Sequence, residues 1–326
     1  MLLKNSKKKL LKHTVKFVSR LYDKPLAPPT DREKELIEEL RASFCELPIS
    51  ETTNSSDSEK EWYEYASCLK ELVINSDHRE FLRWHVISGN MFVKYAGYVV
   101  PELKYLKASS EWQNRWREAI KESPVGHPVP YWKYPSSSGN LIHHAYHIAK
   151  FEEKTKTRIN NVNYILEFGG GYGSMCRLIH NLDFQGKYVI FDLPSFSILQ
   201  QFFLKSIGVE VRFFDSFKTG ENGVLCISSL EQLREILSGR IEMSDSMFIA
   251  TWSISEASIK VRNSILPFVS LFDEFLITYQ NQFCEVNNVD FFEDWKALHK
   301  DIDWYEWEIE HMRGNRYLLG KRKSNI

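Results

Sequence analysis

Four glycines within five residues constrain the fold of this chain more than any other feature. They are Gly169, Gly170, Gly171 and Gly173, and they follow the apolar run Tyr164–Leu166 and the acidic Glu167. A segment with helical character comes next. A strand, a glycine turn and a helix form the entry unit of a nucleotide-binding α/β sheet, in which the glycines let a ligand approach the backbone closely. The sequence therefore predicts an α/β, Rossmann-like fold.

The glycine spacing separates two kinds of nucleotide site. A dinucleotide fingerprint has the form G-x-G-x-x-G, but its third glycine position is Ser174 here. The pattern that is present, acidic-x-Gly-x-Gly-x-Gly, resembles the first motif of class I S-adenosylmethionine methyltransferases. That resemblance assigns cofactor binding to Gly169, Gly171 and Gly173, and it places Glu167 against the methionyl ammonium or the N–H groups of the loop. A plain glycine turn is the alternative.

A second acidic residue follows at the distance that a nucleotide-binding sheet requires. The short apolar run from Tyr188 ends in Asp192, 19 residues after Gly173. An acidic residue about 20 residues after the glycines, at the end of the second strand, binds the ribose hydroxyls, because a carboxylate accepts two hydrogen bonds from a diol. We expect Asp192 and the adjacent Leu193 at the cofactor site. A helix cap or turn is the alternative role for Asp192.

Further strands are predicted along the second half of the chain. The segment 209–217 indicates a third strand that ends at Asp215, which the methyltransferase resemblance would place near the adenine amino group; a turn aspartate is the alternative. The segment 246–252 indicates a fourth strand that brings Trp252 to the cofactor edge of the sheet. A fifth strand ends near Gln280, and the tail alternates like a hairpin around Arg313-Gly314-Asn315. Such a closing hairpin is typical of the methyltransferase fold and foreign to the usual dehydrogenase fold.

The first 135 residues differ in character from the rest. Residues 1–24 are predicted to form a basic amphipathic helix, which could lie on an anionic membrane, contact a glycosyltransferase, or pack on its own domain or on a second copy in a homo-oligomer. Residues 25–135 are expected to form a helical domain, with helices near 31–44, 59–74, 78–95 and 110–122. Residues 136–326 are expected to form the cofactor-binding domain.

Composition narrows the classes of function. The net charge of -1 argues against a nucleic-acid partner, and no apolar run reaches the length of a membrane span. The five cysteines are odd in number and scattered, which predicts buried thiols in a reducing compartment. We therefore expect a cytoplasmic protein, with peripheral contact to the inner membrane as an open option.

A helix rich in histidine precedes the first strand. It opens at Gly139 and Asn140, so its N-terminus should lie over the cofactor site, with Asn140, His143 and His147 as candidate substrate ligands. His143 and His147 are four residues apart, but no third ligand accompanies them, and no metal site is expected. Methylation of a weakly acidic hydroxyl calls for a general base. The sequence offers His144 first, His311 second, and Glu256 after the fourth strand.

The segments IHHAYH, EFGGGYGSM and FDLPSFSILQQFFL together resemble a family of sugar O-methyltransferases from bacterial surface-polysaccharide (O-antigen, lipopolysaccharide or capsule) gene sets. The resemblance covers roughly residues 136–320. It implies S-adenosyl-L-methionine as cofactor and a sugar or glycan hydroxyl as acceptor. A methyltransferase of another small molecule, and a non-catalytic scaffold in a glycan assembly complex, remain as alternatives.

Overall fold

A seven-stranded sheet forms the centre of the molecule in the computed structural model, which describes residues 14–48, 57–238 and 245–323. The strand order is β3-β2-β1-β4-β5-β9-β8. The first five strands of this order are parallel, and β9 joins β5 antiparallel as one arm of a hairpin with β8. The predicted α/β, Rossmann-like sheet with an antiparallel C-terminal hairpin is confirmed.

The strands are short and mostly apolar, as buried parallel strands are. They are β1 (Tyr164–Phe168), β2 (Lys187–Phe191), β3 (Gly223–Ile227), β4 (Ser246–Thr251), β5 (Glu274–Gln280), β8 (Ile302–Glu308) and β9 (Asn315–Arg322). A separate two-stranded ribbon pairs β6 (Gln282–Phe283) with β7 (Val286–Asn287). The hairpin turn uses Gly314 at a φ of 77°, a left-handed conformation that favours glycine.

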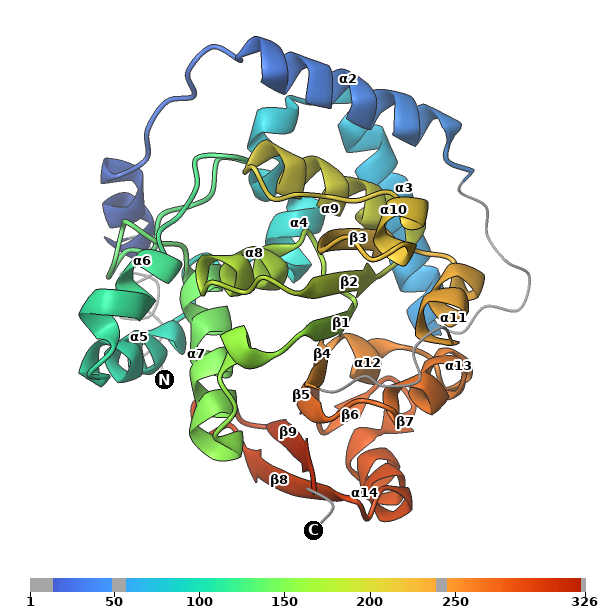
Figure 1. The fold of residues 1–326 in the computed structure, drawn as a ribbon. Helices are drawn as coiled ribbons and strands as arrows, with labels where there is room; N and C mark the ends of the chain where they lie inside the picture. The colour runs from blue at the N-terminus through green and yellow to red at the C-terminus, as the bar shows by residue number, and fades with distance from the viewer. Residues whose placement is uncertain (1–13, 49–56, 239–244, 324–326) are drawn as a thin grey trace.

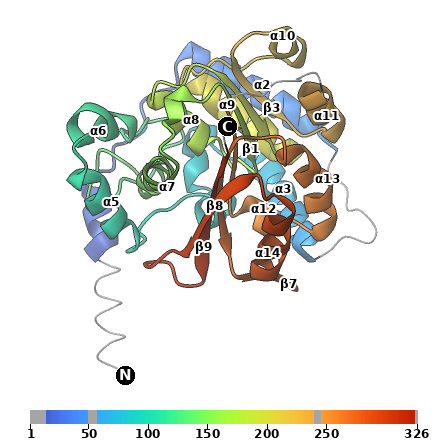
Figure 2. The same cartoon turned by 60° about the horizontal axis from the view of Figure 1, so that its bottom comes forward.

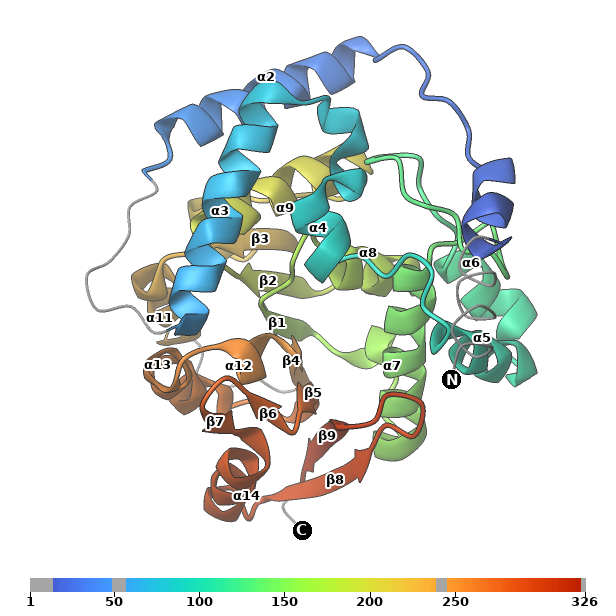
Figure 3. The same ribbon diagram turned by 180° about the vertical axis from the view of Figure 1, so that it is seen from behind.

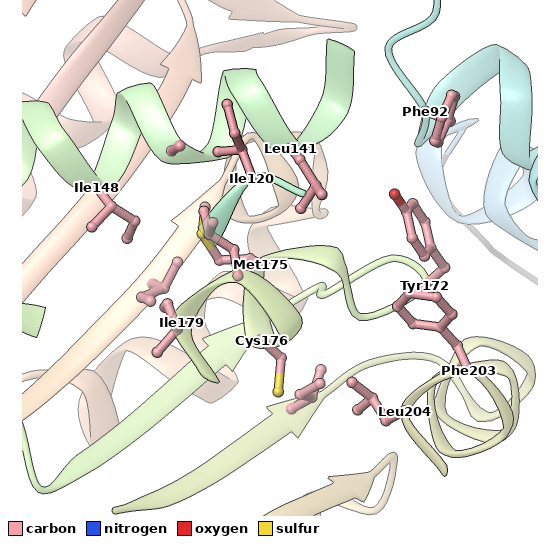
Figure 4. Close-up of a cluster of buried hydrophobic side chains, with 14 of the residues drawn as sticks. Phe92, Ile120, Leu141, Ile148, Tyr172, Met175, Cys176, Ile179, Phe203 and Leu204 are labelled. Atoms are coloured by element: carbon pink, nitrogen blue, oxygen red, sulfur yellow. The ribbon is translucent and has the colours of Figure 1, made fainter. Parts of the chain in front are cut away.

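Helices cover both faces of the sheet (Figures 1 and 2). One face carries α7 (Gly139–Thr155), α8 (Ser174–Asn181) and α9 (Pro194–Ser206); the other carries α11 (Leu230–Ser238), α13 (Ile259–Val269) and α14 (Asn288–Leu298). Alternate strand residues serve the two faces, since Ile165 belongs to the first cluster and Leu166 to the second. Figure 4 shows part of the first cluster, where Met175 and Cys176 lie between side chains of α7 and α9.

The N-terminal part is mainly helical, as predicted. Its helices are α2 (Asp31–Glu46), α3 (Asp57–Asn75), α4 (His85–Asn90), α5 (Val99–Ala108) and α6 (Arg117–Ala119), with short turns of other helix types at His78–Arg83 and Trp112–Trp116. The helix expected over 78–95 is broken at Trp84, and α5 lies in a stretch for which no separate helix was predicted. Thr30 caps α2 through a capping box with Glu33.

These N-terminal helices share one hydrophobic cluster with the first face of the sheet. The cluster runs from Leu36 and Phe44 of α2 through Phe203 of α9 to Leu319 of β9, and α2 packs along α9 at the top of Figure 1. The division of the chain at residues 24 and 135 into separate domains stays a prediction.

Two expectations about single segments are wrong. Residues 209–213 form no strand, and Asp215 lies exposed in the short helix α10 (Phe214–Lys218); Val211 makes only an isolated bridge to Val224 of the real third strand. No disulfide joins the cysteines of the described ranges, but Cys45 and Cys284 are exposed rather than buried. In the described ranges, the structure has no helix long and apolar enough to cross a membrane.

Candidate active site

A cavity of about 1310 Å³ opens at the carboxyl ends of the parallel strands. The strand order reverses direction between β1 and β4, and open α/β sheets bind ligands at such a point. The lining includes residues 167–172 at the end of β1 and in the turn after it, residues 191–195 at the end of β2 and beyond, and residues 251–253 at the end of β4 and beyond. Helix α3 closes the opposite side; Figure 3 shows it descending from α2 toward α12 (Ser253–Glu256) and α13.

The glycine loop has no room for side chains at its start. A Cβ on Gly169, at a φ of 71°, would lie 2.3 Å from the Cβ of Ser253. A Cβ on Gly170 would lie 2.6 Å from Ile190 and 3.2 Å from the Glu167 carboxylate. The Ser253 hydroxyl also donates to the Phe168 carbonyl. Ser253 and Ile190 therefore pack against one side of the glycine loop, and the loop also lines the cavity.

Glu167 is buried at the end of β1 and contributes to the cavity wall. Its Oε2 accepts a hydrogen bond of 2.8 Å from the Tyr188 hydroxyl. Burial raises the pKa of the Glu167 carboxyl to about 8, because the hydrogen bond from Tyr188 offsets only part of the loss of water around the charged form. A cation in the cavity would stabilise the charged form further.

Asp192 connects the end of β2 to the glycine loop. Its Oδ2 accepts from the Gly171 N–H at 3.1 Å and from Gln200 Nε2 at 2.8 Å, and its Oδ1 accepts from the Leu193 N–H at 2.7 Å. The Gly170 N–H also favours the charged form of this carboxylate, so the protein itself supplies donors for most of its lone-pair positions, of which a carboxylate has about four. Burial raises the pKa of Asp192 to about 7 in spite of these donors. Leu193, 40% exposed, lies beside it in the cavity wall.

Of the other predicted cofactor-binding residues, one lines the cavity and two lie outside its lining. Trp252 lines the cavity with a φ of 65°, rare for a residue with a side chain, and its indole N–H donates to Asn315 at 2.7 Å. Gly173 caps α8 but is outside the lining. Asp215 is outside it too, because the strand expected to carry it does not form. The end of the real β3 brings Ser228 and Leu230 to the cavity instead.

The histidine-rich helix α7 does reach the cavity, although not with every predicted residue. His143, His144 and Asn140 line it, whereas His147 lies behind the wall. The Asn140 amide is committed to the protein: its Nδ2 donates to Tyr172 and Ser174 at 2.9 and 3.0 Å. These hydrogen bonds connect the start of α7 to the glycine loop and the start of α8.

A buried acid that the sequence analysis missed organises the histidines. Glu102 of α5 is 0% exposed, and its Oε1 accepts from His143 Nδ1 and from His311 Nε2, each at 2.8 Å. His143 Nε2 lies 3.1 Å from His147 Nε2, and His147 Nδ1 lies 2.6 Å from the Tyr317 hydroxyl. Glu102 lies on the apolar side of α5, at helical spacing from Val99 and Leu106, and a charge at a core position was the available signal.

One assignment of protons satisfies this whole chain of contacts. Burial keeps the pKa of His147 well below its ordinary value, so that ring is neutral. The Tyr317 hydroxyl then donates to His147 Nδ1, His147 Nε2–H to His143 Nε2, and His143 Nδ1–H to Glu102. The two histidines hold the pKa of Glu102 below its ordinary value against the effect of burial. Both nitrogens of His143 are occupied, so its ring contributes shape rather than a free base.

The three base candidates therefore differ in position. His311 is bonded to Glu102 and is outside the cavity lining. His144 lines the cavity, its Nδ1 is buried without a partner, and burial lowers its pKa to about 3. Glu256 also lines the cavity, and burial raises its pKa to about 7. Within the part of the chain that the structure describes, no three His, Cys, Asp or Glu side chains are grouped to hold a metal ion.

Comparison with known proteins gives similarity at the level of chain trace alone. No protein-family model matches the sequence, and no curated protein matches it. Among solved structures, the SAH-bound methyltransferase PaMTH1 of Podospora anserina is 12% identical over 84% of this chain and 100% of its own, with a TM-score of 0.38. The precorrin-6y C5,15-methyltransferase of Geobacter metallireducens is 12% identical over 56% and 87%, with a TM-score of 0.35. Protein PH0226 of Pyrococcus horikoshii is 11% identical over 57% and 92%, with a TM-score of 0.38. Similarity at this level says nothing about substrate, so the function has to be inferred from the residues of this chain.

Proposed function

We propose that this protein is an S-adenosylmethionine-dependent O-methyltransferase. The observation that carries the proposal is the Asp192 carboxylate, which accepts from the Gly171 N–H at the end of the neighbouring strand and lines the cavity. A glycine loop held in this way can contact a nucleoside ligand with its backbone, while the carboxylate beside it accepts hydrogen bonds from the ribose hydroxyls. The sequence resemblance pointed to the same residues.

The residues present fit this cofactor in charge as well as in shape. Two carboxyls, the buried Glu167 and the half-buried Asp192, share the cavity wall and have raised pKa values of about 8 and about 7. A ligand with a sulfonium and an ammonium group would favour their charged forms. Asp192 would hold the ribose, Glu167 the methionyl end, and Ser228 with Leu230 would border the base. When bound, the cofactor supplies an activated methyl group.

The cavity is larger than one ligand needs. Ligand pockets commonly enclose about 300–1,000 Å³, and this one encloses about 1310 Å³. Its lining includes aromatic side chains beyond those of the sheet, namely Trp62 and Tyr63 on α3 and Tyr98 before α5. Aromatic faces suit the apolar faces of sugar rings, and holding an acceptor hydroxyl close to the methyl group could supply about 7–11 kcal/mol of the barrier reduction.

We therefore propose a sugar hydroxyl as the acceptor, in the synthesis of a bacterial surface polysaccharide. The support for a sugar is the resemblance of IHHAYH, EFGGGYGSM and FDLPSFSILQQFFL to sugar O-methyltransferases, together with the aromatic cavity wall. Another small-molecule acceptor is the alternative within the same chemistry. A non-catalytic scaffold is the alternative outside it.

Two measurements test the proposal. Titration calorimetry should show that S-adenosylmethionine binds, and incubation with methyl-labelled cofactor and a panel of sugars, phenols and carboxylates should transfer label to a sugar. Label on a phenol or carboxylate instead would replace the acceptor but keep the enzyme class. Cofactor binding without transfer to any acceptor or glycan extract would favour the scaffold, and absence of binding would remove the function altogether.

Peripheral contact with an anionic membrane is a separate proposal about location. Most of the basic segment 1–24 lies outside the described residues. Within residues 14–24, Lys16 and Arg20 are exposed beside Phe17, which is 62% exposed, and Leu21, which is 66% exposed. Basic and apolar side chains together favour an anionic membrane surface. Cosedimentation with phosphatidylglycerol vesicles, but not with phosphatidylcholine vesicles, is the expected result.

A further inference from the structure

A buried polar network surrounds Glu256, and the reaction described so far does not account for it. Gln280, at the end of β5, directs its side-chain Nε2 to Glu256 Oε1 at 3.4 Å. The other end of that amide, Oε1, lies 2.9 Å from the Ser255 hydroxyl. Ser255 is itself buried and also lies 2.7 Å from the Trp252 carbonyl.

The backbone on both sides of Glu256 is held by a single cation. Arg262 of α13 is 0% exposed; its guanidinium donates to the Ser255 carbonyl at 2.6 Å and to the Ala257 carbonyl at 2.9 Å. Its third contact is Asn288 Oδ1 at 2.7 Å, and Asn288 Nδ2 in turn donates to the Gln280 carbonyl at 2.9 Å. The contacts thus form a closed frame from α13 through α14 and β5 back to Glu256.

Burying the Arg262 guanidinium in this frame costs free energy that a purely structural contact would not need. A buried guanidinium without a carboxylate partner carries a large desolvation penalty, and burial lowers the pKa of Arg262 to about 10. Among the ion pairs of the described residues, none includes Arg262. Its planar fork instead fixes the peptide groups on either side of one cavity-lining carboxyl.

The Gln280 amide can serve Glu256 in both protonation states. When Glu256 is charged, it accepts from Gln280 Nε2, and the Ser255 hydroxyl can donate to Gln280 Oε1. When Glu256 carries a proton, a turn of the amide about its last bond lets Oε1 accept from the carboxylic acid. Nε2 then donates to the Ser255 oxygen, whose proton is directed to the Trp252 carbonyl. A proton can therefore arrive at Glu256 without leaving a buried group unpaired.

We propose that Glu256 is the general base of the reaction and that Arg262, Asn288, Gln280 and Ser255 are the positioning residues that aim it into the cavity. The inference rests on the proposed methyl transfer. The acceptor oxygen gains the methyl group, the electron pair of the broken carbon–sulfur bond stays on sulfur, and the hydroxyl proton passes to a Glu256 carboxylate oxygen. His144, first in the sequence-based order, becomes part of the cavity wall.

The charged groups around Glu256 agree with this role. Helix α3 places Glu61 near it, whose charge adds to burial in raising the pKa of Glu256, and Tyr65 of the same helix is within its electrostatic reach. Lys60 lines the same cavity, and Arg262 lies behind the backbone. A base works best when its pKa lies near the working pH, and the pKa of about 7 meets that condition.

The first test needs no acceptor. In the full chain labelled with 13C at the glutamate side-chain carbons, one carboxyl resonance should titrate near neutral pH and be missing in Glu256→Gln. Gln280→Leu removes the donor to the charged form and should raise that pKa by half a unit or more. Gln282→Leu, the same change at an exposed neighbouring position, should leave it in place. A Glu256 resonance that titrates in the range of an ordinary exposed glutamate, or that ignores Gln280→Leu, overturns the inference.

A second readout separates this inference from the proposed function. Calorimetry with S-adenosylmethionine should give a similar Kd for Glu256→Gln and the wild type, while transfer of labelled methyl to the acceptor found by the panel falls by about 10²–10⁴-fold. Failure of the wild type to bind the cofactor counts against the proposed function. Undiminished transfer by a Glu256→Gln variant that binds the cofactor counts against Glu256 alone.

Discussion

The indole of Trp252 lies nearly parallel to the imidazole of His143, with ring centroids 5.5 Å apart and an interplanar angle of 21°. One ring comes from the end of β4 and the other from α7, so the contact joins the sheet to the helix that precedes it. Glu102 behind His143 and Asn315 behind Trp252 fix the two rings from outside the cavity. These protein contacts hold the two rings in place, and a wall held in this way lowers the entropy lost on binding.

Removal of the carboxylate behind this wall should destabilise the protein. Glu102→Leu leaves the N–H group of the buried His143 and that of the half-buried His311 without their acceptor, and a buried donor left unsatisfied costs about 1–3 kcal/mol. Chemical denaturation should show a fall of that size in the free energy of unfolding. Glu310→Leu, the same change at an exposed position, should stay within about 0.5 kcal/mol. Equal stability of the two variants would mean that Glu102 does not organise the histidines.

Asp192→Ala should weaken cofactor binding by more than about tenfold. The change removes the acceptor for the ribose hydroxyls and for the Gly171 N–H, and each hydrogen bond to a charged group contributes about 1.5–3 kcal/mol. Calorimetric titration with S-adenosylmethionine measures the effect. Asp215→Ala is the matched control, because Asp215 is exposed in α10 and outside the cavity. An Asp215→Ala variant as weak as Asp192→Ala would restore the adenine contact that the sequence suggested.

Binding of S-adenosylmethionine should release protons near neutral pH. The pKa of the Glu167 carboxyl is about 8 and that of Asp192 about 7, both raised by burial, so each is partly protonated at pH 7. A positively charged ligand favours the ionised forms, and affinity should rise as the pH increases from 6 to 8. Calorimetry in buffers with different ionisation enthalpies counts the protons released. Glu167→Gln should show fewer protons released and a flatter pH profile; an unchanged profile would exclude Glu167 as a partner of the cationic end.

Gly170→Ala should disrupt the glycine loop, whereas Gly89→Ala should not. A Cβ at Gly170 would lie 2.6 Å from Ile190, on a strand that cannot move without breaking the sheet, while a Cβ at Gly89 meets nothing within 4 Å. Alanine in place of a helical glycine gains about 0.5–1 kcal/mol. Thermal unfolding and cofactor titration of both variants test this pair. Wild-type behaviour of Gly170→Ala would show that the loop is looser than its packing indicates.

The sequence predicted those parts of the sheet that depend on residues close together in the chain. The glycine turn after β1, Asp192 after β2 and the hairpin around Gly314 each depend on a few adjacent residues. The third strand failed because residues 209–217 and 223–227 are both short and apolar-rich, and only pairing with β2 decides between them. The true strand, GVLCI, is the more continuously apolar of the two, as a strand buried on both faces should be.

The polar networks could not be predicted from the sequence in the same way. Glu102 meets residues 41 and 209 positions away, and no periodicity encodes contacts of that range. The position of the histidines on the predicted helix correctly placed His143 and His144 at the cavity. It could not show that both ring nitrogens of His143 make hydrogen bonds within the protein. The Arg262 frame was missed altogether, since an arginine in an amphipathic helix reads as a solvent-facing residue until its burial is known.

The packing of α2 along α9 also limits how this chain can be shortened or recombined. Helix α9 carries Gln200, which supports Asp192, on one side and accepts α2 on the other. A fragment beginning near residue 136 would expose that second side to water and loosen the helix that supports the nucleoside-binding carboxylate. Grafts onto other proteins should therefore take the chain from α2 onward, because a shorter fragment would expose to water the face of α9 that α2 covers.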